Sequence, residues 1–246
     1  MVGEALAGLP ASHRGRRRVD LHPSNARDLL RIAGAASVTR RPRFHRLLGE
    51  SLCVVVRFLI GAYPAGNEPD GPEQTLYFAN HTSHLDTLTL LAALSPGARA
   101  RTRPVAARDY WCASPLRHWV AEKVLNVVFI DRQRQAGDPL DPVRAALAEG
   151  WSLIMFPEGT RRDQQLPSEF KSGIYRLASE FPDLHLKPVY LENLHRILPK
   201  GSMLPLPLIN RVHFGQALAR LQAEDKTTFL ARAHAAVCEL CPGTEP

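Results

Sequence analysis

Residues 75–94 read TLYFANHTSHLDTLTLLAAL and place a polar cluster between two apolar segments. The segment TLYFA (75–79) is typical of a short buried strand, and LDTLTLLAAL (85–94) has the composition of a helix. In α/β proteins, ligands bind beyond the carboxyl ends of the strands. The polar residues between this strand and this helix therefore lie where a functional site is expected.

The same alternation continues along the rest of the chain. Further buried strands are predicted at 103–107, 126–130, 151–156, 184–193 and 211–215. Helices are predicted among them at 114–125, 141–150, 173–181 and 227–240. Strands separated by helical segments favour an α/β fold, with a layered, largely parallel or mixed sheet flanked by helices.

Two of these helices carry clear signals at their ends. Ser114 is the expected N-cap of one helix, with Pro115 at its first position. Asp141 is the expected N-cap of another, which should have Pro142 in its first turn and end at Gly150.

The N-terminal segment differs from the rest of the chain in charge. Residues 1–50 hold ten arginines and four acidic residues, so +6 of the formal net charge of +7 lies there. A basic segment on a nearly neutral body favours contact with an anionic partner, either nucleic acid or a membrane surface. Residues 1–13 lack the positive start and the long apolar core of a secretory signal.

An N-terminal helical extension at the membrane interface is predicted ahead of the α/β domain. Residues 24–38 have the pattern of a capped amphipathic helix, and 51–63 (SLCVVVRFLIGAY) are the most apolar run. This run has 13 residues and contains Arg57, whereas a spanning helix needs about 20 apolar residues. We expect it to lie in a membrane interface or to pack as a core helix.

The expected domain boundaries follow from these segments. Residues 1–63 would form the basic arm and the membrane-associated helices. A linker rich in Pro and Gly (64–74) opens the α/β domain, which would extend over 64–240, and 241–246 would be a tail.

The four cysteines do not form the pattern of a disulfide framework. Cys238 and Cys241 form a single CxxC pair without a second pair nearby, which disfavours zinc and leaves redox use as the weaker alternative. Buried or unreactive thiols in a reducing compartment are the better interpretation.

The polar cluster after the first strand allows three interpretations. Ser83 and Asp86 have the spacing of a helix capping box, which leaves Asn80 and His81 unexplained. A metal site would use His81, His84 and Asp86, but no second cluster with helical ligand spacing accompanies them. Alternatively, Asp86 bonds one imidazole nitrogen of His81 and leaves the other unprotonated as a general base. The spacing alone leaves capping and catalysis open.

Polar segments follow other predicted strands as well. DRQR (131–134), PEGTRR (157–162) and the residues near Glu192 lie at or close to strand ends. Arg132 and Arg161 at adjacent strand ends would form a phosphate clamp, because guanidinium groups match phosphate oxygens. Surface turns are the alternative explanation for each segment alone. Neither GxxxxGK[ST] nor GxGxxG occurs, so nucleotide chemistry is unsupported.

Taken in order, these segments resemble the sequence blocks of the glycerolipid acyltransferases, the family of 1-acylglycerol-3-phosphate acyltransferases. NHTSHLD (80–86) is similar to the NHxxxxD block, VFIDR (128–132) to the second block and FPEGTRR (156–162) to the third. LKPVYLEN (186–193) resembles the fourth block loosely, because it lacks the second proline that is usual there. EFKSGIYRLA (169–178) is similar to the Lys-x-Gly stretch that often follows the third block.

The resemblance implies acyl transfer without a covalent enzyme intermediate. His81, oriented by Asp86, would deprotonate the hydroxyl of a lyso-glycerolipid, which would attack the thioester of acyl-CoA or acyl-carrier protein. No cofactor and no metal ion is implied, and no GxSxG nucleophile motif occurs. Arg132 would hold the acceptor phosphate. The acceptor pocket would be shaped by four residues of the third block: Glu158, Gly159, Thr160 and Arg161.

The leading hypothesis is a peripheral membrane O-acyltransferase of phospholipid biosynthesis, which makes phosphatidic acid from lysophosphatidic acid at the cytoplasmic side of the cell membrane. The departure in the fourth block leaves open another acceptor, such as a lyso-ornithine lipid or a non-phosphorylated alcohol. The intact His81–Asp86 pair disfavours a catalytically silent lipid-binding relative. A nucleic-acid-binding protein would use the arginine-rich arm, but the arm has only Phe44 nearby for stacking and no RRM, KH or zinc-finger signature.

Overall fold

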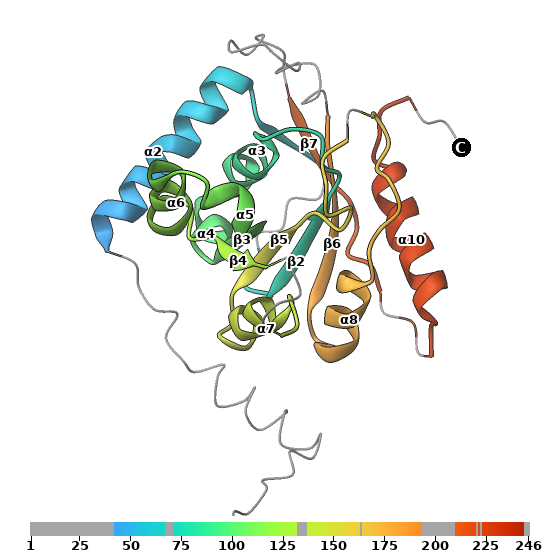
Figure 1. Cartoon of the computed structure of the whole chain (residues 1–246). Helices are drawn as coiled ribbons and strands as arrows, with labels where there is room; N and C mark the ends of the chain where they lie inside the picture. Colours follow the sequence, from blue (N-terminus) through green and yellow to red (C-terminus); the bar gives the residue numbers. More distant parts are fainter. Residues whose placement is uncertain are drawn as a thin grey trace, which may run out of the picture.

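The computed structural model describes residues 42–66, 71–131, 137–162, 164–192, 210–219, 221 and 223–243. The predicted helix at 24–38 and most of the basic arm therefore lie outside the described residues. Within the described part, one mixed β-sheet forms the centre and helices cover both of its faces (Figure 1).

The sheet has seven strands in the order β1-β7-β6-β2-β5-β3-β4. Strands β6, β2, β5, β3 and β4 run parallel to one another, whereas β7 is antiparallel to β6 and pairs in parallel with β1. The bounds of the strands are β1 (Tyr63–Gly66), β2 (Thr75–Ala79), β3 (Thr102–Ala107), β4 (Val128–Ile130), β5 (Ser152–Met155), β6 (His185–Leu191) and β7 (Arg211–Phe214).

The helices divide between the two faces of the sheet (Figure 1). One face is covered by the N-terminal group: α2 (Arg43–Ile60), α3 (Asp86–Ala93), α4 (Pro96–Ala100), α5 (Arg108–Trp111), α6 (Pro115–Trp119) and the π-helical turn η1 (Val120–Val124). The other face is covered by α7 (Asp141–Ala148), α8 (Gly173–Glu180) and α10 (Lys226–Cys238). The expected class, an α/β fold with a mixed sheet flanked by helices, is confirmed.

Strand β2 shows why the central strands are apolar throughout. All five of its residues are buried. Leu76 and Phe78 belong to the core under α7, α8 and α10, whereas Tyr77 and Ala79 belong to the core under α2 and α3. Successive side chains of a strand alternate between its faces, so a strand covered on both sides needs a continuous apolar run. The predicted strand at 75–79 has the same bounds as β2.

Helix α2 combines a core-facing side with an exposed apolar side. Cys53, Val56 and Ile60 are buried in the core that α2 shares with α3. The helix ends at Gly61, which adopts a left-handed conformation with φ 67° and donates its backbone N–H to the carbonyl oxygen of Arg57. Within the described residues, no helix is both long and apolar enough to cross a membrane.

Two local predictions need correction. Strand β1 lies partly within the segment predicted as a linker (64–74), and it pairs with β7, far away in the sequence. Asp141 does not cap α7: the N-cap is Leu140, and Asp141 lies in the first turn, where its carboxylate accepts a hydrogen bond from Arg144. By contrast, Ser114 does cap α6, because its side chain accepts from the backbone N–H of Arg117.

Candidate active site

The predicted pairing of His81 and Asp86 is present at the carboxyl end of β2. His81 Nδ1 lies 2.7 Å from Asp86 Oδ2, and the Asp86 side chain is fully buried. The same oxygen accepts the backbone N–H groups of Thr82 at 2.7 Å and Ser83 at 2.9 Å. An ionised carboxylate only accepts hydrogen bonds, so Nδ1 of His81 carries the proton and Nε2 is left as the basic nitrogen.

The capping-box prediction for Ser83 and Asp86 needs correction. The N-cap of α3 is Leu85, which makes no side-chain capping bond, and Asp86 is the first residue of the helix. Its Oδ2 fixes the turn before the helix by accepting from Ser83 N–H, and the same oxygen orients the imidazole. Ser83 plays a smaller part, since its hydroxyl accepts only from Leu85 N–H at 3.3 Å. Among the described residues, no group of three His, Cys, Asp or Glu side chains is arranged to hold a metal ion.

The loop after β5 packs directly onto His81. The His81 ring stacks on Phe156, with the ring centroids 4.3 Å apart and the planes 18° apart. The backbone N–H of His81 donates to Glu158 Oε1 at 2.7 Å, and its carbonyl oxygen accepts from Arg162 N–H at 3.0 Å. Since β2 and β5 are neighbouring parallel strands, their carboxyl ends bring the first and third sequence blocks together.

Glu158 connects three loop segments. Its side chain is buried, and while Oε1 accepts from His81, Oε2 accepts both the backbone N–H and the hydroxyl of Ser168, at 2.8 and 2.7 Å. Both carboxylate oxygens thus bond to the protein itself. In this arrangement, Glu158 shapes the site by holding the His81 loop and the 168 loop against each other.

The turn that follows Glu158 requires glycine. Gly159 has φ 73°, a backbone conformation that side chains with a Cβ rarely adopt. Its N–H donates to the carbonyl oxygen of Phe156 at 3.0 Å, and a Cβ at this position would lie 2.6 Å from Lys171 Nζ. The turn leaves Thr160 and Arg161 exposed at the rim of the site.

His84, which the sequence offered as a possible metal ligand, lies at the rim of the site. Its ring is exposed and stacks on Tyr110 of α5, with centroids 4.7 Å apart. Partial desolvation, followed by the positive charge of Arg161, lowers the pKa of His84 below its ordinary value. The charged form of His84 is therefore disfavoured at the rim, next to a cationic side chain.

The structure describes one of the two remaining predicted strand-end segments. Arg132 lies outside the described residues, so its position stays a prediction. The expectation that Arg132 and Arg161 follow adjacent strands is wrong, because β3 lies between β4 and β5 in the sheet. Glu192 follows β6, and its Oε2 lies 2.9 Å from Nε2 of His213 on β7. The loop after β3 was overlooked: Arg108 and Tyr110 follow the predicted strand at 103–107 directly, and the same strand-end reasoning would have selected them.

Asn80 secures the base of the site. Its buried side chain accepts from the backbone N–H of Leu191 at 2.7 Å and donates to the Leu191 carbonyl oxygen at 3.2 Å. This pair of side-chain bonds ties the residue after β2 to Leu191 on the neighbouring strand β6. It fixes the point at which the chain leaves β2 toward His81.

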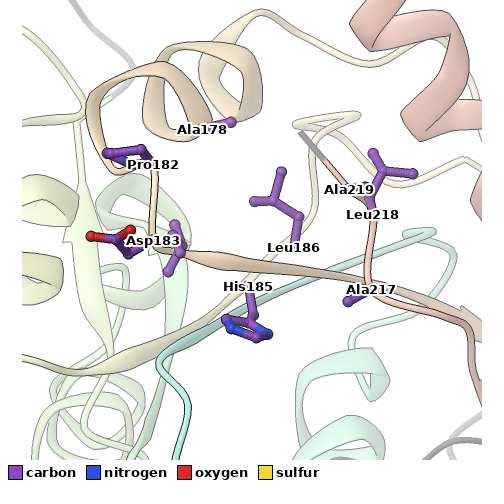
Figure 2. Close-up of a pocket in the computed structure, with 9 residues that line it drawn as sticks. Ala178, Pro182, Asp183, His185, Leu186, Ala217, Leu218 and Ala219 are labelled. Carbon is purple, nitrogen blue, oxygen red and sulfur yellow. The ribbon is translucent and has the colours of Figure 1, made fainter. Parts of the chain in front are cut away.

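A depression of about 350 Å³ lies elsewhere on the molecule (Figure 2). Its lining includes His185, Leu186 and Leu218, and His185 is paired with Thr75, the first residue of β2. His81 follows the last residue of the same strand. The depression is thus at the amino ends of the strands, away from the His81–Asp86 pair.

Fold and site together define an α/β protein with a His–Asp pair at the carboxyl edge of its sheet. The chain matches the Acyltransferase family over residues 66–192, which is more than half of its length. It therefore belongs to the Acyltransferase family, and it resembles that family's 1-acylglycerol-3-phosphate acyltransferases.

Relatives of this chain carry that name. It is 26% identical over 167 residues to the chloroplastic 1-acyl-sn-glycerol-3-phosphate acyltransferase LPAT1 of Arabidopsis thaliana, covering 66% of this chain and 45% of the relative. It is 34% identical over 109 residues to a probable 1-acyl-sn-glycerol-3-phosphate acyltransferase of Mycoplasma pneumoniae, covering 42% and 39%. It is 36% identical over 106 residues to 1-acyl-sn-glycerol-3-phosphate acyltransferase alpha of Homo sapiens, and this match covers 41% of this chain and 34% of the relative. The matches span less than half the length of these relatives.

A solved structure shares the fold. The crystal structure of the 1-acyl-sn-glycerophosphate acyltransferase PlsC from Thermotoga maritima superposes with a TM-score of 0.64 at 18% identity, covering 88% of this chain and 87% of that one. At this identity the likeness establishes the common fold.

Proposed function

We propose that this chain is an O-acyltransferase that moves an acyl chain from a thioester to the free hydroxyl of lysophosphatidic acid, giving phosphatidic acid. The observation that carries the proposal is the His81–Asp86 pair, in which a buried carboxylate holds Nδ1 at 2.7 Å and leaves Nε2 as the base. The names of the relatives support lysophosphatidic acid as the acceptor.

In the proposed reaction, Nε2 of His81 accepts the proton of the acceptor hydroxyl as its oxygen attacks the thioester carbonyl carbon. A tetrahedral oxyanion forms and then collapses, breaking the carbon–sulfur bond. The leaving thiolate takes the proton from His81, which restores the neutral imidazole. Asp86 stabilises the imidazolium between these steps and keeps the ring in place. The donor is acyl-CoA or acyl-carrier protein, and no cofactor is needed.

The acceptor phosphate would lie at the rim of the site. Arg161 is exposed on the loop that carries Glu158. Arg132 follows β4 in the sequence, and one strand, β3, separates β4 from β5 in the sheet. Guanidinium groups bind phosphate oxygens in paired, charge-assisted hydrogen bonds. Both arginines are proposed to hold the phosphate while the hydroxyl meets His81.

The protein is further proposed to work at an anionic membrane surface on the cytoplasmic side, since the acceptor is a lipid. The outer side of α2 supports this, because it exposes Phe44, Leu47, Val54, Val55, Phe58 and Leu59. Phe58 is 86% exposed. Such an apolar side next to a basic arm is the composition of an interfacial anchor.

An acyl-transfer assay tests the proposal. The purified chain is offered lysophosphatidic acid, a lyso-ornithine lipid and a non-phosphorylated monoacylglycerol, each with acyl-CoA and with acyl-carrier protein. We expect the highest kcat/KM with lysophosphatidic acid. A preference for another acceptor would keep the chemistry and replace the substrate, whereas no transfer with any pair would refute the proposal.

A further inference from the structure

The ring of Tyr110 gathers three side chains from separate parts of the chain. His84, from the loop after β2, stacks on it with centroids 4.7 Å apart. The guanidinium carbon of Arg161, from the loop after β5, lies 5.1 Å from the ring centroid. The guanidinium carbon of Arg117, from α6, lies 5.4 Å from the same centroid. One ring thus positions two guanidinium groups at the edge of the sheet.

These two guanidinium groups have no acidic partner in the part of the chain that the structure describes. The ion pairs there involve other arginines, such as Arg144 with Glu180 and Arg232 with Glu224. Like charges held around one ring repel each other, and the ring quadrupole offsets this only in part. A dianion bound between the two groups would remove the repulsion and satisfy their N–H donors.

The pair lies next to the proposed base. Arg161 is followed by Arg162, whose backbone N–H is bonded to the His81 carbonyl oxygen. Burial lowers the pKa of His84, and the positive charges of Arg161 and Arg117 lower it further, so both guanidinium groups lie near this ring. An anion bound here would therefore lie beside the reacting groups.

We propose that Arg117 and Arg161, both placed by Tyr110, form a phosphate-binding subsite of the active site. The inference rests on the proposed function and adds Arg117, which lies outside the sequence blocks, as a residue that selects a phosphorylated substrate. The phosphate belongs either to the head group of the acceptor or to coenzyme A, because both present the same oxygens to an arginine pair.

Steady-state kinetics of Arg117→Ala test the subsite. Loss of a charge-assisted hydrogen bond raises a KM by about ten- to a hundredfold. A rise in the KM for lysophosphatidic acid assigns the subsite to the acceptor, and a rise in the KM for acyl-CoA assigns it to the donor. The Arg117→Lys variant keeps the charge and should recover part of the loss.

Arg103→Ala is the matched control. Its guanidinium carbon also lies 5.4 Å from an aromatic centroid, that of Trp151, but at the amino end of β3. If Arg117→Ala changes neither KM more than Arg103→Ala does, the subsite does not exist.

A binding measurement separates this inference from the proposed function, because it requires no turnover. Glycerol 3-phosphate and coenzyme A are titrated separately, and the ring signals of His84 are followed by NMR. We expect saturable shifts with at least one of the two ligands in the unaltered protein. In Arg117→Ala, the Kd for that ligand should rise by at least about tenfold. Such shifts without acyl transfer would refute the function alone, whereas equal binding by both proteins would refute the subsite.

Discussion

Asp86 is the residue on which the local geometry of the site depends. One of its oxygens accepts from His81 Nδ1 and from two backbone N–H groups, so its position is set by the backbone before any substrate arrives. A carboxylate held in this way keeps one imidazole tautomer. The same carboxylate oxygen therefore fixes the turn before α3 and orients His81.

The His81–Asp86 pair can be tested against its neighbour His84. His81→Ala should lower kcat by about 10²–10⁴, the usual contribution of a positioned general base. Asp86→Asn should also lower kcat strongly, because an amide no longer stabilises the imidazolium. His84→Ala should lower it far less, because that ring stacks on Tyr110 at the rim. An inactive His84→Ala beside an active His81→Ala would reverse the assignment.

Glu158 should act on stability as well as on rate. Glu158→Gln replaces one buried acceptor oxygen with an NH₂ group that faces a donor, either His81 N–H or Ser168. An unsatisfied buried polar group costs about 1–3 kcal/mol, so Tm should fall together with kcat. Glu122→Gln, on an exposed carboxylate of η1, is the control and should leave Tm nearly unchanged. A Glu158→Gln protein with unaltered Tm and lowered kcat would instead indicate direct contact with substrate.

At the scale of one element, α2 presents apolar side chains in two directions. Ile60 is 5% exposed and Phe58 is 86% exposed, although only one residue separates them. The helical rotation of about 100° per residue turns one toward α3 and the other outward. The inward side chains pack in the core, and the outward ones are proposed to contact the membrane, so substitutions on each side should have different effects.

Substitutions on α2 should divide accordingly. Ile60→Ala should destabilise the fold by about 2–5 kcal/mol, measured by chemical unfolding, because it leaves a cavity in the core. Phe58→Ser should leave Tm unchanged and weaken sedimentation with anionic vesicles roughly tenfold, because burying a Phe side chain contributes about 1.5–3 kcal/mol. Vesicle binding by Phe58→Ser equal to that of the unaltered protein would remove α2 from the proposed anchor.

At the scale of the whole molecule, most of the net charge lies in a segment that precedes the site residues in the sequence. Residues 1–50 carry +6 of the net +7, whereas the His81–Asp86 pair lies at the edge of the sheet. Arginines near an anionic leaflet contribute about 1 kcal/mol each, and the effect decays over a Debye length of about 8–10 Å. The arm would thus hold the α/β body at the surface from which a lyso-lipid enters.

A chain that begins at residue 42 tests this role of the arm, since it keeps α2 whole. It should fold with an unchanged Tm and bind anionic vesicles more weakly at low salt, with little further loss as salt rises. The full chain should bind more strongly at low salt and lose part of that binding as salt rises. Equal sedimentation of both chains would show that the arm is no anchor. Tighter binding of the full chain to duplex DNA at matched salt would favour the nucleic-acid hypothesis.

The strands of this fold were predictable where burial alone specifies them. Segments such as 75–79 are apolar at every position because helices cover both faces of the sheet, and this pattern is visible in the sequence. Strand β1 was not predictable, because YPAG contains both Pro and Gly and becomes a strand only through pairing with β7. The N-cap of α7 was misplaced by one residue, because Asp141 joins Arg144 in the first turn.

The candidate site also contains contacts that the sequence predicts and contacts that only the tertiary structure shows. The contact between His81 and Asp86 spans five residues, so the turn after β2 and the start of α3 suffice to form it, and the sequence indicates it. Other contacts form only because β2, β5 and β3 are neighbours in the sheet. They are the bond of Glu158 to His81 and the contacts of Tyr110 with Arg117 and Arg161. Strand order results from packing both faces of the sheet at once, over contacts far apart in the chain. The spacing of residues along the sequence does not specify the order of the strands, so only the tertiary structure shows these contacts.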